Sequence, residues 1–330
     1  MEKVTLDGLD KEVSRIGLGT WAIGGWLWGG TDERRSIETI LAALERGITL
    51  IDTAPVYGFG VSEEIVGKAL EEFGNRDQVV LSTKVGLEWR DGKVFRNSTP
   101  ERIRKEVEDS LRRLRVERID IYHVHWPDPL VPYEKTAETL QKLKEEGKIA
   151  AAAVSNYDPQ QMEAFRKETT LSVLQPPYNL FERGIESEIL PYCQKPDRKV
   201  ALMTYGALCR GLLSGRMTGD TTFGEGDLRS WDPKFTEPRF GQYLEAVRRL
   251  DELARERHGK RVIHLAVRWI LDQGVEMALW GGRSPEQIEP VEEMMGWSLT
   301  VEDLQAIDRV LEETVRDPVG PEFMAPPARG

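Results

Sequence analysis

Short apolar runs rich in β-branched residues alternate with amphipathic helical patterns along most of the chain. Eight such runs predict strands, at residues 16–20, 49–52, 79–84, 119–125, 149–155, 171–178, 200–205 and 276–280. Between them, apolar residues recur at helical spacing, as in Ile37, Ile40 and Leu44, and Gly47 is placed to end that helix. This alternation is typical of parallel strands joined by crossover helices.

Start signals for helices support the same reading. Thr99-Pro100 and Asp158-Pro159 each place an N-cap residue before a proline in the first helical turn. Ser62 is predicted to cap the helix after the second strand, and residues 284–287 (Ser-Pro-Glu-Gln) have a capping-box pattern after the eighth. Further helices are predicted at 243–257, at 262–272 and from Thr300 onward.

Eight strand–helix units are what a (β/α)8 TIM barrel requires. A doubly wound sheet would normally carry a Gly-x-Gly-x-x-Gly turn after its first strand, and residues 17–22 do not match that spacing. Residues 1–15 alternate around Asp7-Gly8 and predict a hairpin that plugs the N-terminal end of the barrel. We therefore predict one barrel domain over residues 1–330, with an N-terminal β-hairpin and extra C-terminal helices.

The formal net charge of −11 argues against a dedicated nucleic-acid binder, which should be basic. Cys193 and Cys209 give neither a disulfide framework nor metal-ligand spacing. The N-terminus lacks the apolar core of a signal peptide, and no apolar run is long enough to span a membrane. We expect a cytoplasmic protein that has no nucleic-acid or membrane partner and is a monomer or a small homo-oligomer.

Three polar residues end successive predicted strands, and they suit chemistry together. Asp52, Lys84 and His125 are the last polar residues of the second, third and fourth strands, and Tyr57 follows Asp52 by five residues. Active sites of barrels lie at the C-terminal ends of strands, and neighbouring strands are about 4.8 Å apart. An acid, a lysine, a histidine and a phenol at one spot suit proton transfer to a carbonyl oxygen. Taken singly, each residue has an ordinary structural role: Asp52 as a helix or loop cap, Lys84 as a solvated rim residue and His125 as a hydrogen-bonded core residue.

A metal-dependent hydrolase is a competing reading, because His123 and His125 point to the same strand face. Such a site needs further ligands at other strand ends. The remaining histidines, His258 and His264, fall in helical patterns. We therefore expect no metal site, and we expect His123 to lie inside the barrel beneath His125.

Five segments resemble the signatures of the aldo-keto reductases in order and spacing. They are Gly17-Leu18-Gly19-Thr20-Trp21, Ile51-Asp52-Thr53-Ala54-Pro55-Val56-Tyr57-Gly58, Ser82-Thr83-Lys84, Val124-His125-Trp126-Pro127-Asp128 and Val154-Ser155-Asn156. Matching patterns extend from about residue 12 to residue 315. Residues 21–25 and 320–324 look closest to bacterial members that act on polyols, sugars and small aldehydes.

The resemblance implies an NADP(H)-dependent oxidoreductase that reversibly reduces aldehydes and ketones to alcohols, without a Rossmann fold. Glyceraldehyde, sugars and polyols such as glycerol are the expected substrates. Tyr57 would be the general acid and base, and Lys84, held by Asp52, would lower its pKa. His125 would donate to the substrate oxygen. Trp21, Trp28 and Trp126 are candidate walls of the substrate pocket, with ordinary packing as the alternative, which is favoured for Trp26.

The resemblance also assigns cofactor contacts. It implies that Ser155, Asn156 and Gln175 bind the nicotinamide carboxamide and that Tyr205 stacks on the ring. A loop at 205–216 would cover the pyrophosphate, and Arg283 would hold the 2′-phosphate. The full set of predicted cofactor residues is Gly19, Thr20, Trp21, Asp52, Ser155, Asn156, Gln175, Tyr205, Gly206, Ala207, Leu208, Arg210, Gly211, Leu213, Gly215, Arg216, Gly281, Gly282, Arg283 and Gln287.

Two departures from the family pattern bear on these contacts. Pro290-Val291 stands where members commonly have Glu-Asn, and Trp280 replaces the usual proline before the glycine. The first leaves the adenine contacts, and with them the preference for NADP over NAD, open. The potassium-channel β subunits are similar to this family and supply an alternative, a cofactor-binding partner protein with weak catalysis. The filled catalytic positions and the lack of a long N-terminal blocking segment in this sequence favour the enzyme.

Overall fold

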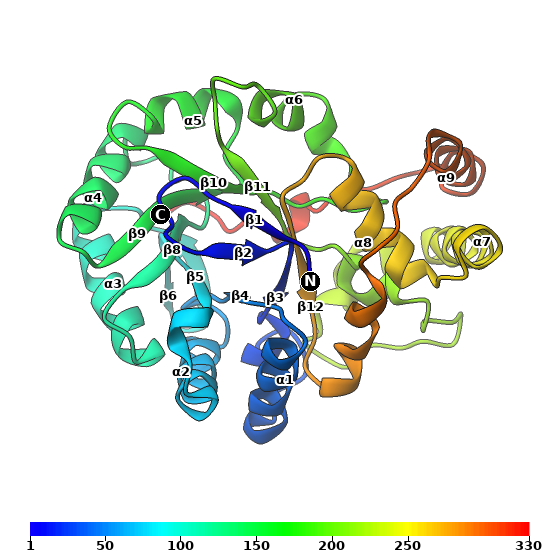
Figure 1. Cartoon of the computed structure of the whole chain (residues 1–330), viewed down its shortest axis with the longest axis horizontal. Helices are drawn as coiled ribbons and strands as arrows, with labels where there is room; N and C mark the ends of the chain where they lie inside the picture. Colours follow the sequence, from blue (N-terminus) through cyan, green and yellow to red (C-terminus); the bar gives the residue numbers. More distant parts are fainter. Residues whose placement is uncertain (330) are drawn as a thin grey trace.

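The computed structural model describes residues 1–329. Eight parallel strands close a barrel in the order β3-β4-β5-β8-β9-β10-β11-β12, with β12 paired to β3 (Figure 1). The strands are β3 (Ile16–Gly19), β4 (Leu50–Asp52), β5 (Val80–Val85), β8 (Ile119–Val124), β9 (Ile149–Ser155), β10 (Leu171–Gln175), β11 (Ala201–Thr204) and β12 (Met277–Gly281). The predicted (β/α)8 barrel is confirmed, and the doubly wound sheet is excluded.

Helices surround the barrel on its outside (Figure 1). They are α1 (Glu33–Glu45), α2 (Val61–Phe73), α3 (Pro100–Leu114), α4 (Tyr133–Glu145), α5 (Pro159–Phe165), α6 (Ile189–Cys193), α7 (Arg239–His258), α8 (Val262–Asp272) and α9 (Val301–Thr314). The extra helices α7 and α9 pack on each other, and α8 lies between them and the strands. Thr300 caps α9, so the helices predicted near the C-terminus are confirmed.

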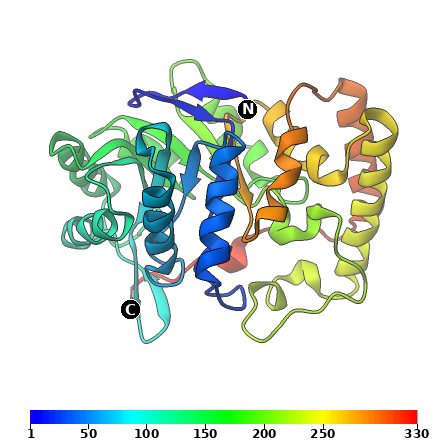
Figure 2. The same cartoon turned by 60° about the horizontal axis from the view of Figure 1, so that its bottom comes forward.

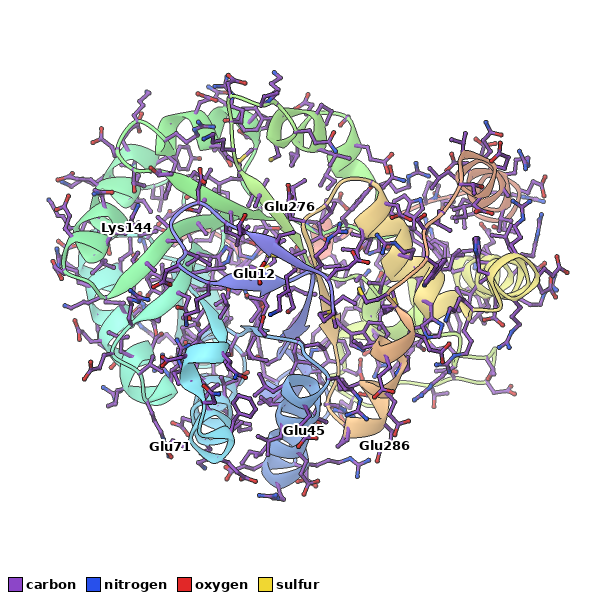
Figure 3. All side chains as sticks on the ribbon, in the orientation of Figure 1. Glu12, Glu45, Glu71, Lys144, Glu276 and Glu286 are labelled. Atoms are coloured by element: carbon purple, nitrogen blue, oxygen red, sulfur yellow. The ribbon has the colours of Figure 1, made fainter. Side chains whose placement is uncertain are left out.

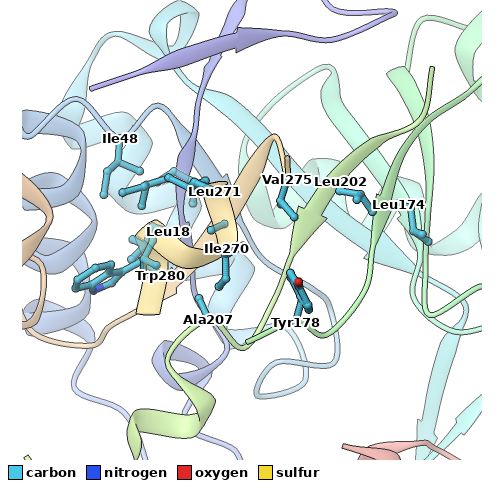
Figure 4. Close-up of a cluster of buried hydrophobic side chains, with 14 of the residues drawn as sticks. Leu18, Ile48, Leu174, Tyr178, Leu202, Ala207, Ile270, Leu271, Val275 and Trp280 are labelled. Atoms are coloured by element: carbon cyan, nitrogen blue, oxygen red, sulfur yellow. The ribbon is translucent and has the colours of Figure 1, made fainter. Parts of the chain in front are cut away.

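Apolar side chains fill both faces of the barrel wall. Inside, Leu50, Val80 and Ile121 belong to a buried cluster contributed by several strands. Outside, side chains such as Leu18, Leu202 and Trp280 pack against the helices, and Figure 4 shows Ile270 and Leu271 of α8 among them. Burial on both faces explains why the strand sequences are almost continuously apolar.

A hairpin of β1 (Lys3–Thr5) and β2 (Glu12–Ser14) crosses the N-terminal end of the barrel (Figure 1). Leu6 and Val13 from this hairpin join the apolar cluster inside the barrel. Its turn contains Gly8, whose φ of 91° favours glycine. The predicted plug is confirmed. Figure 2 shows it at the opposite end of the barrel from the C-terminal residues.

Thr99 and Asp158 cap α3 and α5 as predicted. The helix starts predicted at Ser62 and at residues 284–287 differ from the structure. Gly60 precedes α2, and the Ser62 hydroxyl instead bonds to Thr20 and Thr53 across strand ends.

Residues 284–287 do not begin an α-helix. They lead into short 3-10 turns at Pro285–Gln287 and Glu289–Glu293, and the Ser284 side chain makes no cap bond. Pro290 removes a backbone donor there, and the Gln287 side chain is engaged by the backbone N–H of Arg283 at 2.9 Å.

Charged side chains cover the outside of the helical ring. Glu45, Glu71 and Glu286 are exposed, and Figure 3 shows them on the outer surface of the molecule. Among residues 1–329, the helices are too short or too polar to cross a membrane.

Candidate functional site

The four predicted catalytic residues meet at the C-terminal end of the barrel. Lys84 Nζ donates to Asp52 Oδ2 at 2.6 Å and to the Thr53 carbonyl at 3.0 Å. The same ammonium lies 4.9 Å from the centre of the Tyr57 ring. The rings of Tyr57 and His125 are 5.8 Å apart and meet edge to face. Neighbouring strand ends therefore place an acid, an ammonium, a phenol and an imidazole together.

The Asp52 carboxylate is fixed by bonds to both of its oxygens. Oδ1 accepts from the Ser82 hydroxyl at 2.8 Å and from the Gln175 amide at 3.0 Å, while Oδ2 accepts from Lys84. Burial lowers the pKa of Lys84, and the adjacent Asp52 charge opposes that shift. The arrangement holds the ammonium in place at the base of the site.

Tyr57 differs from its predicted electrostatics. Burial, together with the Asp52 charge, raises the pKa of Tyr57 well above its usual value. The expected lowering by Lys84 is wrong for this structure, because burial is the larger effect and the charge of Asp52, which pairs with the ammonium at 2.6 Å, adds to it. Tyr57 is therefore a neutral phenol that carries its proton.

His125 is also uncharged. Burial, followed by the Lys84 and His123 charges, lowers the pKa of His125 well below its usual value. A neutral imidazole still donates one N–H. Tyr57 and His125 thus offer two uncharged donors to the same cavity, which suits a carbonyl oxygen that gains negative charge.

His123 lies inside the barrel wall, as predicted. It is fully buried, pairs in register with Lys84, and its Nδ1 lies 3.4 Å from the Val154 carbonyl. His258 and His264 are in α7 and α8. Among residues 1–329, no group of three or more His, Cys, Asp or Glu side chains is arranged to hold a metal ion.

A cavity of about 470 Å³ opens above these residues. Its lining is mostly apolar and includes Trp21 and Trp126, as predicted, and also Trp26. Trp28 is not among the lining residues. It packs edge to face on Trp21 with ring centres 5.6 Å apart and so supports the wall from behind.

Sequence reasoning missed much of the cavity wall. Leu87 and Val94 come from an added hairpin of β6 (Leu87–Arg90) and β7 (Lys93–Arg96). Its Asp91-Gly92 turn is a recognisable hairpin signal.

Other missed wall residues come from two long segments. They are Leu228 and Trp231 from the loop after β11, and Phe323, Met324 and Pro326 from the C-terminal tail. No periodic pattern marks these segments, because neither forms a long regular element.

The residues predicted to bind a nicotinamide carboxamide form one hydrogen-bonded wall of this cavity. Ser155 Oγ donates to the Gln175 carbonyl at 2.7 Å, and Asn156 Nδ2 donates to Ser155 Oγ at 3.0 Å. The Tyr205 hydroxyl donates to Asn156 Oδ1 at 3.0 Å. All four residues line the cavity beside Tyr57, so amide groups and an aromatic ring are presented together.

Trp21 supplies a further sign that a polar ligand belongs here. Its ring stacks on Tyr57 with centres 5.9 Å apart, and its buried indole N–H has no partner within residues 1–329. An unpaired buried donor in a cavity wall fits a ligand that carries an acceptor. Gly19 and Thr20 lie just before it, and the Thr20 hydroxyl donates to the Asp52 carbonyl at 2.9 Å.

The predicted pyrophosphate loop places its two arginines differently. The Arg210 guanidinium is buried in ion pairs with Glu182 and Asp232, so it is not free to meet a phosphate. Arg216 is exposed and makes no ion pair within residues 1–329.

The backbone of this loop depends on its glycines, and several of its side chains are buried. Gly206, Gly211 and Gly215 have φ values of 75°, 93° and 72°, which favour glycine. Ala207 and Leu213 are buried in the outer core, and Leu208 is partly buried against it. The backbone N–H groups of Gly211 and Leu213 donate to the Leu208 carbonyl within the loop.

The segment predicted to hold a 2′-phosphate is a preformed turn. Arg283 is exposed, and its guanidinium donates to the Trp28 carbonyl. The buried Trp280 indole donates to the Gln287 carbonyl at 2.9 Å, which accounts for tryptophan at this position. A side chain at Gly282 would meet Ile288 at 2.8 Å, while Gly281 is open. The turn therefore presents an arginine at the surface.

Comparisons with known proteins agree with this geometry. The profile of the aldo/keto reductase family matches residues 15–312. Aldo-keto reductase YhdN of Bacillus subtilis (strain 168) is 58% identical over 330 residues, covering 100% of this chain and 99% of that protein. The NADH-specific methylglyoxal reductase of Escherichia coli (strain K12) is 38% identical over 304 residues, covering 87% and 91%.

Solved structures show the same fold. The glycerol dehydrogenase AKR11B4 from Gluconobacter oxydans has a TM-score of 0.89 and 53% identity, covering 98% of this chain and 99% of that one. An aldo/keto reductase from Klebsiella pneumoniae in complex with NADP and acetate has a TM-score of 0.70 and 29% identity, covering 92% and 93%. Together with the site, these matches show that the chain belongs to the aldo/keto reductase family.

Proposed function

We propose that this protein reduces small aldehydes and ketones to alcohols with NADP(H), and that it oxidises such alcohols in the reverse direction. The observation that carries the proposal is the convergence of two uncharged donors, Tyr57 and His125, at the floor of an apolar cavity. The buried Asp52–Lys84 pair lies directly behind them.

The nicotinamide would supply the hydride, since side chains cannot deliver one. The protein's task is then to manage the carbonyl oxygen. His125 donates its N–H to that oxygen and orients it, while Tyr57 gives up its phenolic proton as negative charge develops there. The Lys84 ammonium, 4.9 Å from the Tyr57 ring, would offset part of the cost that burial and the Asp52 charge place on the phenolate that remains. In oxidation the same phenolate accepts the proton.

The residues present fit a dinucleotide. Ser155, Asn156 and Gln175 offer amide and hydroxyl groups to a carboxamide, and Tyr205 offers an aromatic face. The glycine-rich loop at 206–216 offers backbone groups and the free charge of Arg216 to the pyrophosphate. Arg210 shapes this loop from within.

Arg283 would read the 2′-phosphate, since a guanidinium on an exposed turn is suited to bidentate phosphate contact. This is the basis for NADP(H) over NAD(H). The similar methylglyoxal reductase of Escherichia coli is NADH-specific by name, so the preference depends on this arginine rather than on family membership.

Small hydroxylated carbonyl compounds and polyols suit the cavity. Its volume of about 470 Å³ admits short chains, and its apolar tryptophan walls leave polar recognition to the few groups at the floor. The names of two similar proteins, a glycerol dehydrogenase and a methylglyoxal reductase, support this class.

The test is a spectrophotometric screen of NADPH and NADH with short aldehydes and ketoses, and of NADP+ and NAD+ with polyols. Turnover of at least one short hydroxylated pair with NADP(H) is expected. If no compound supports turnover with either cofactor, the binding-only alternative replaces the enzyme.

A further inference from the structure

Four buried charged residues form a closed cluster beside the site. They are Glu182, Arg210, Asp232 and Lys234, and none of their side chains is more than 4% exposed. Arg210 Nε donates to Asp232 Oδ2 at 2.6 Å, and its guanidinium also bonds Glu182. Lys234 Nζ lies 2.8 Å from Glu182 Oε1 and 3.8 Å from Asp232 Oδ1. Two positive and two negative charges therefore balance.

The four residues come from segments far apart in the sequence. Glu182 follows β10, and Arg210 lies in the loop after β11 that is proposed to cover the pyrophosphate. Asp232 and Lys234 belong to the long loop that brings Leu228 and Trp231 to the cavity wall.

The cluster also reaches the C-terminal tail. Lys234 Nζ donates to the Gly320 carbonyl at 3.2 Å, and the Phe323 ring lies 5.7 Å from the Arg210 guanidinium carbon. Phe323 and its neighbour Met324 line the cavity. A single charge network thus contacts the proposed cofactor loop and two walls of the substrate cavity.

Stability alone does not account for this arrangement. A buried ion cluster is commonly no more stabilising than apolar side chains of the same volume, whereas its directional bonds fix one geometry. Although burial would raise the pKa of Glu182, the Arg210 and Lys234 charges lower it, so the carboxylate is ionised. Arg210 also holds a left-handed backbone, with φ of 55°, which other contacts must maintain.

We propose that Glu182, Arg210, Asp232 and Lys234 are positioning residues that couple cofactor binding at the 206–216 loop to ordering of the tail over the substrate cavity. Fixing the Arg210 loop fixes Glu182 and Lys234, and through Lys234 it fixes the tail at Gly320. Cofactor and carbonyl substrate then bind with positive coupling. This inference rests on the proposed cofactor site.

The test uses a charge-balanced double variant, Glu182→Gln/Lys234→Met. It removes one acid and one base, keeps the direct Arg210–Asp232 pair, and releases the tail from Lys234. The matched control is Arg249→Met/Glu313→Gln, which removes a pair 2.6 Å apart that joins α7 and α9 at the surface. Hydrogen exchange of peptides covering residues 316–329 is measured with and without saturating NADPH, together with KM and kcat.

In the wild type and the control, NADPH is expected to slow exchange of the tail at least fivefold. In the double variant, NADPH still binds but the protection falls below twofold, and KM for the carbonyl substrate rises at least tenfold while kcat changes less than threefold. Wild-type-like protection in the double variant, or no protection in the wild type with NADPH bound, would overturn the coupling. Failure of the wild type to bind either nicotinamide, seen by fluorescence, would instead refute the proposed function and the coupling with it.

Discussion

Lys84 Nζ donates to Asp52 Oδ2 across 2.6 Å, and both side chains are almost completely removed from solvent. Burying an ion pair this deeply is costly unless every charge is met. Here the second carboxylate oxygen accepts from Ser82 and Gln175, and the ammonium also meets the Thr53 carbonyl. The pair therefore places a fixed positive charge beside Tyr57.

Breaking this pair on one side should cost both stability and activity. Lys84→Met leaves the buried Asp52 charge uncompensated, and we expect a loss of about 3–5 kcal/mol in the free energy of unfolding. The double variant Asp52→Asn/Lys84→Met should recover most of that loss in urea denaturation and remain inactive. Restored activity in the double variant would show that the charge beside Tyr57 is dispensable.

The pH dependence should differ between the two reaction directions. Burial and Asp52 raise the pKa of Tyr57, so the phenol keeps its proton through neutral pH, and His125, whose pKa is lowered, stays uncharged. Reduction needs the phenol, so its kcat should be flat between roughly pH 6.5 and 10, a range bounded by the ordinary pKa values of His and Tyr. Oxidation needs the phenolate and should rise with pH across that range. A reduction rate that falls with an apparent pKa near the ordinary value for histidine would show that a charged imidazole is the donor.

Arg283→Ala should weaken NADPH more than NADH. Loss of a charge-assisted contact costs about 1.5–3 kcal/mol, which corresponds to a roughly 10- to 150-fold weaker Kd for NADPH. Fluorescence titration with both cofactors measures it. The control is Arg35→Ala, an exposed arginine that pairs with Glu286 at 2.8 Å beside the same turn. Equal losses for NADPH and NADH in Arg283→Ala would remove this residue from phosphate recognition.

Arg96 should control the shape of the substrate cavity. Its Nε donates to the Pro326 carbonyl at 2.8 Å, another guanidinium nitrogen donates to the Pro127 carbonyl at 2.9 Å, and it lies 5.3 Å from the Trp126 ring centre. Arg96→Met should raise KM for the carbonyl substrate about tenfold, the effect of one lost hydrogen-bonded charge, and leave the cofactor Kd unchanged. Arg90→Met, an exposed change on the same hairpin, is the control. A changed cofactor Kd with an unchanged KM would contradict this assignment.

The barrel and the catalytic residues follow from local signals in the sequence. Strands buried on both faces are continuously apolar, so a polar residue such as Asp52 or Lys84 at a strand end is conspicuous, and parallel register brings such residues together. The strands predicted at 171–178 and 200–205 are longer than β10 and β11, and beyond these two strands only an isolated parallel bridge between Pro177 and Tyr205 continues the pairing.

The parts that sequence could not supply depend on distant contacts. The Ser62 hydroxyl bonds Thr20 and Thr53 instead of capping α2, since those partners lie at other strand ends. Trp28 is aromatic and near Trp21 in the sequence, but the conformation of its glycine-rich loop places it behind Trp21 and not in the cavity lining. The tail reaches the cavity through contacts with Arg96 and Lys234, which no spacing along the chain reveals. Arg210 looks like a phosphate ligand until Glu182 and Asp232 are placed beside it.

The single-turnover rate of Tyr57→Phe with NADPH and a short aldehyde tests most directly whether Tyr57 transfers the proton. The NADPH Kd of the same variant is measured alongside it. We expect the rate to fall by about 10²–10⁴, the usual contribution of a general acid, while the Kd changes less than threefold. A rate within tenfold of the wild type at the same Kd would contradict it.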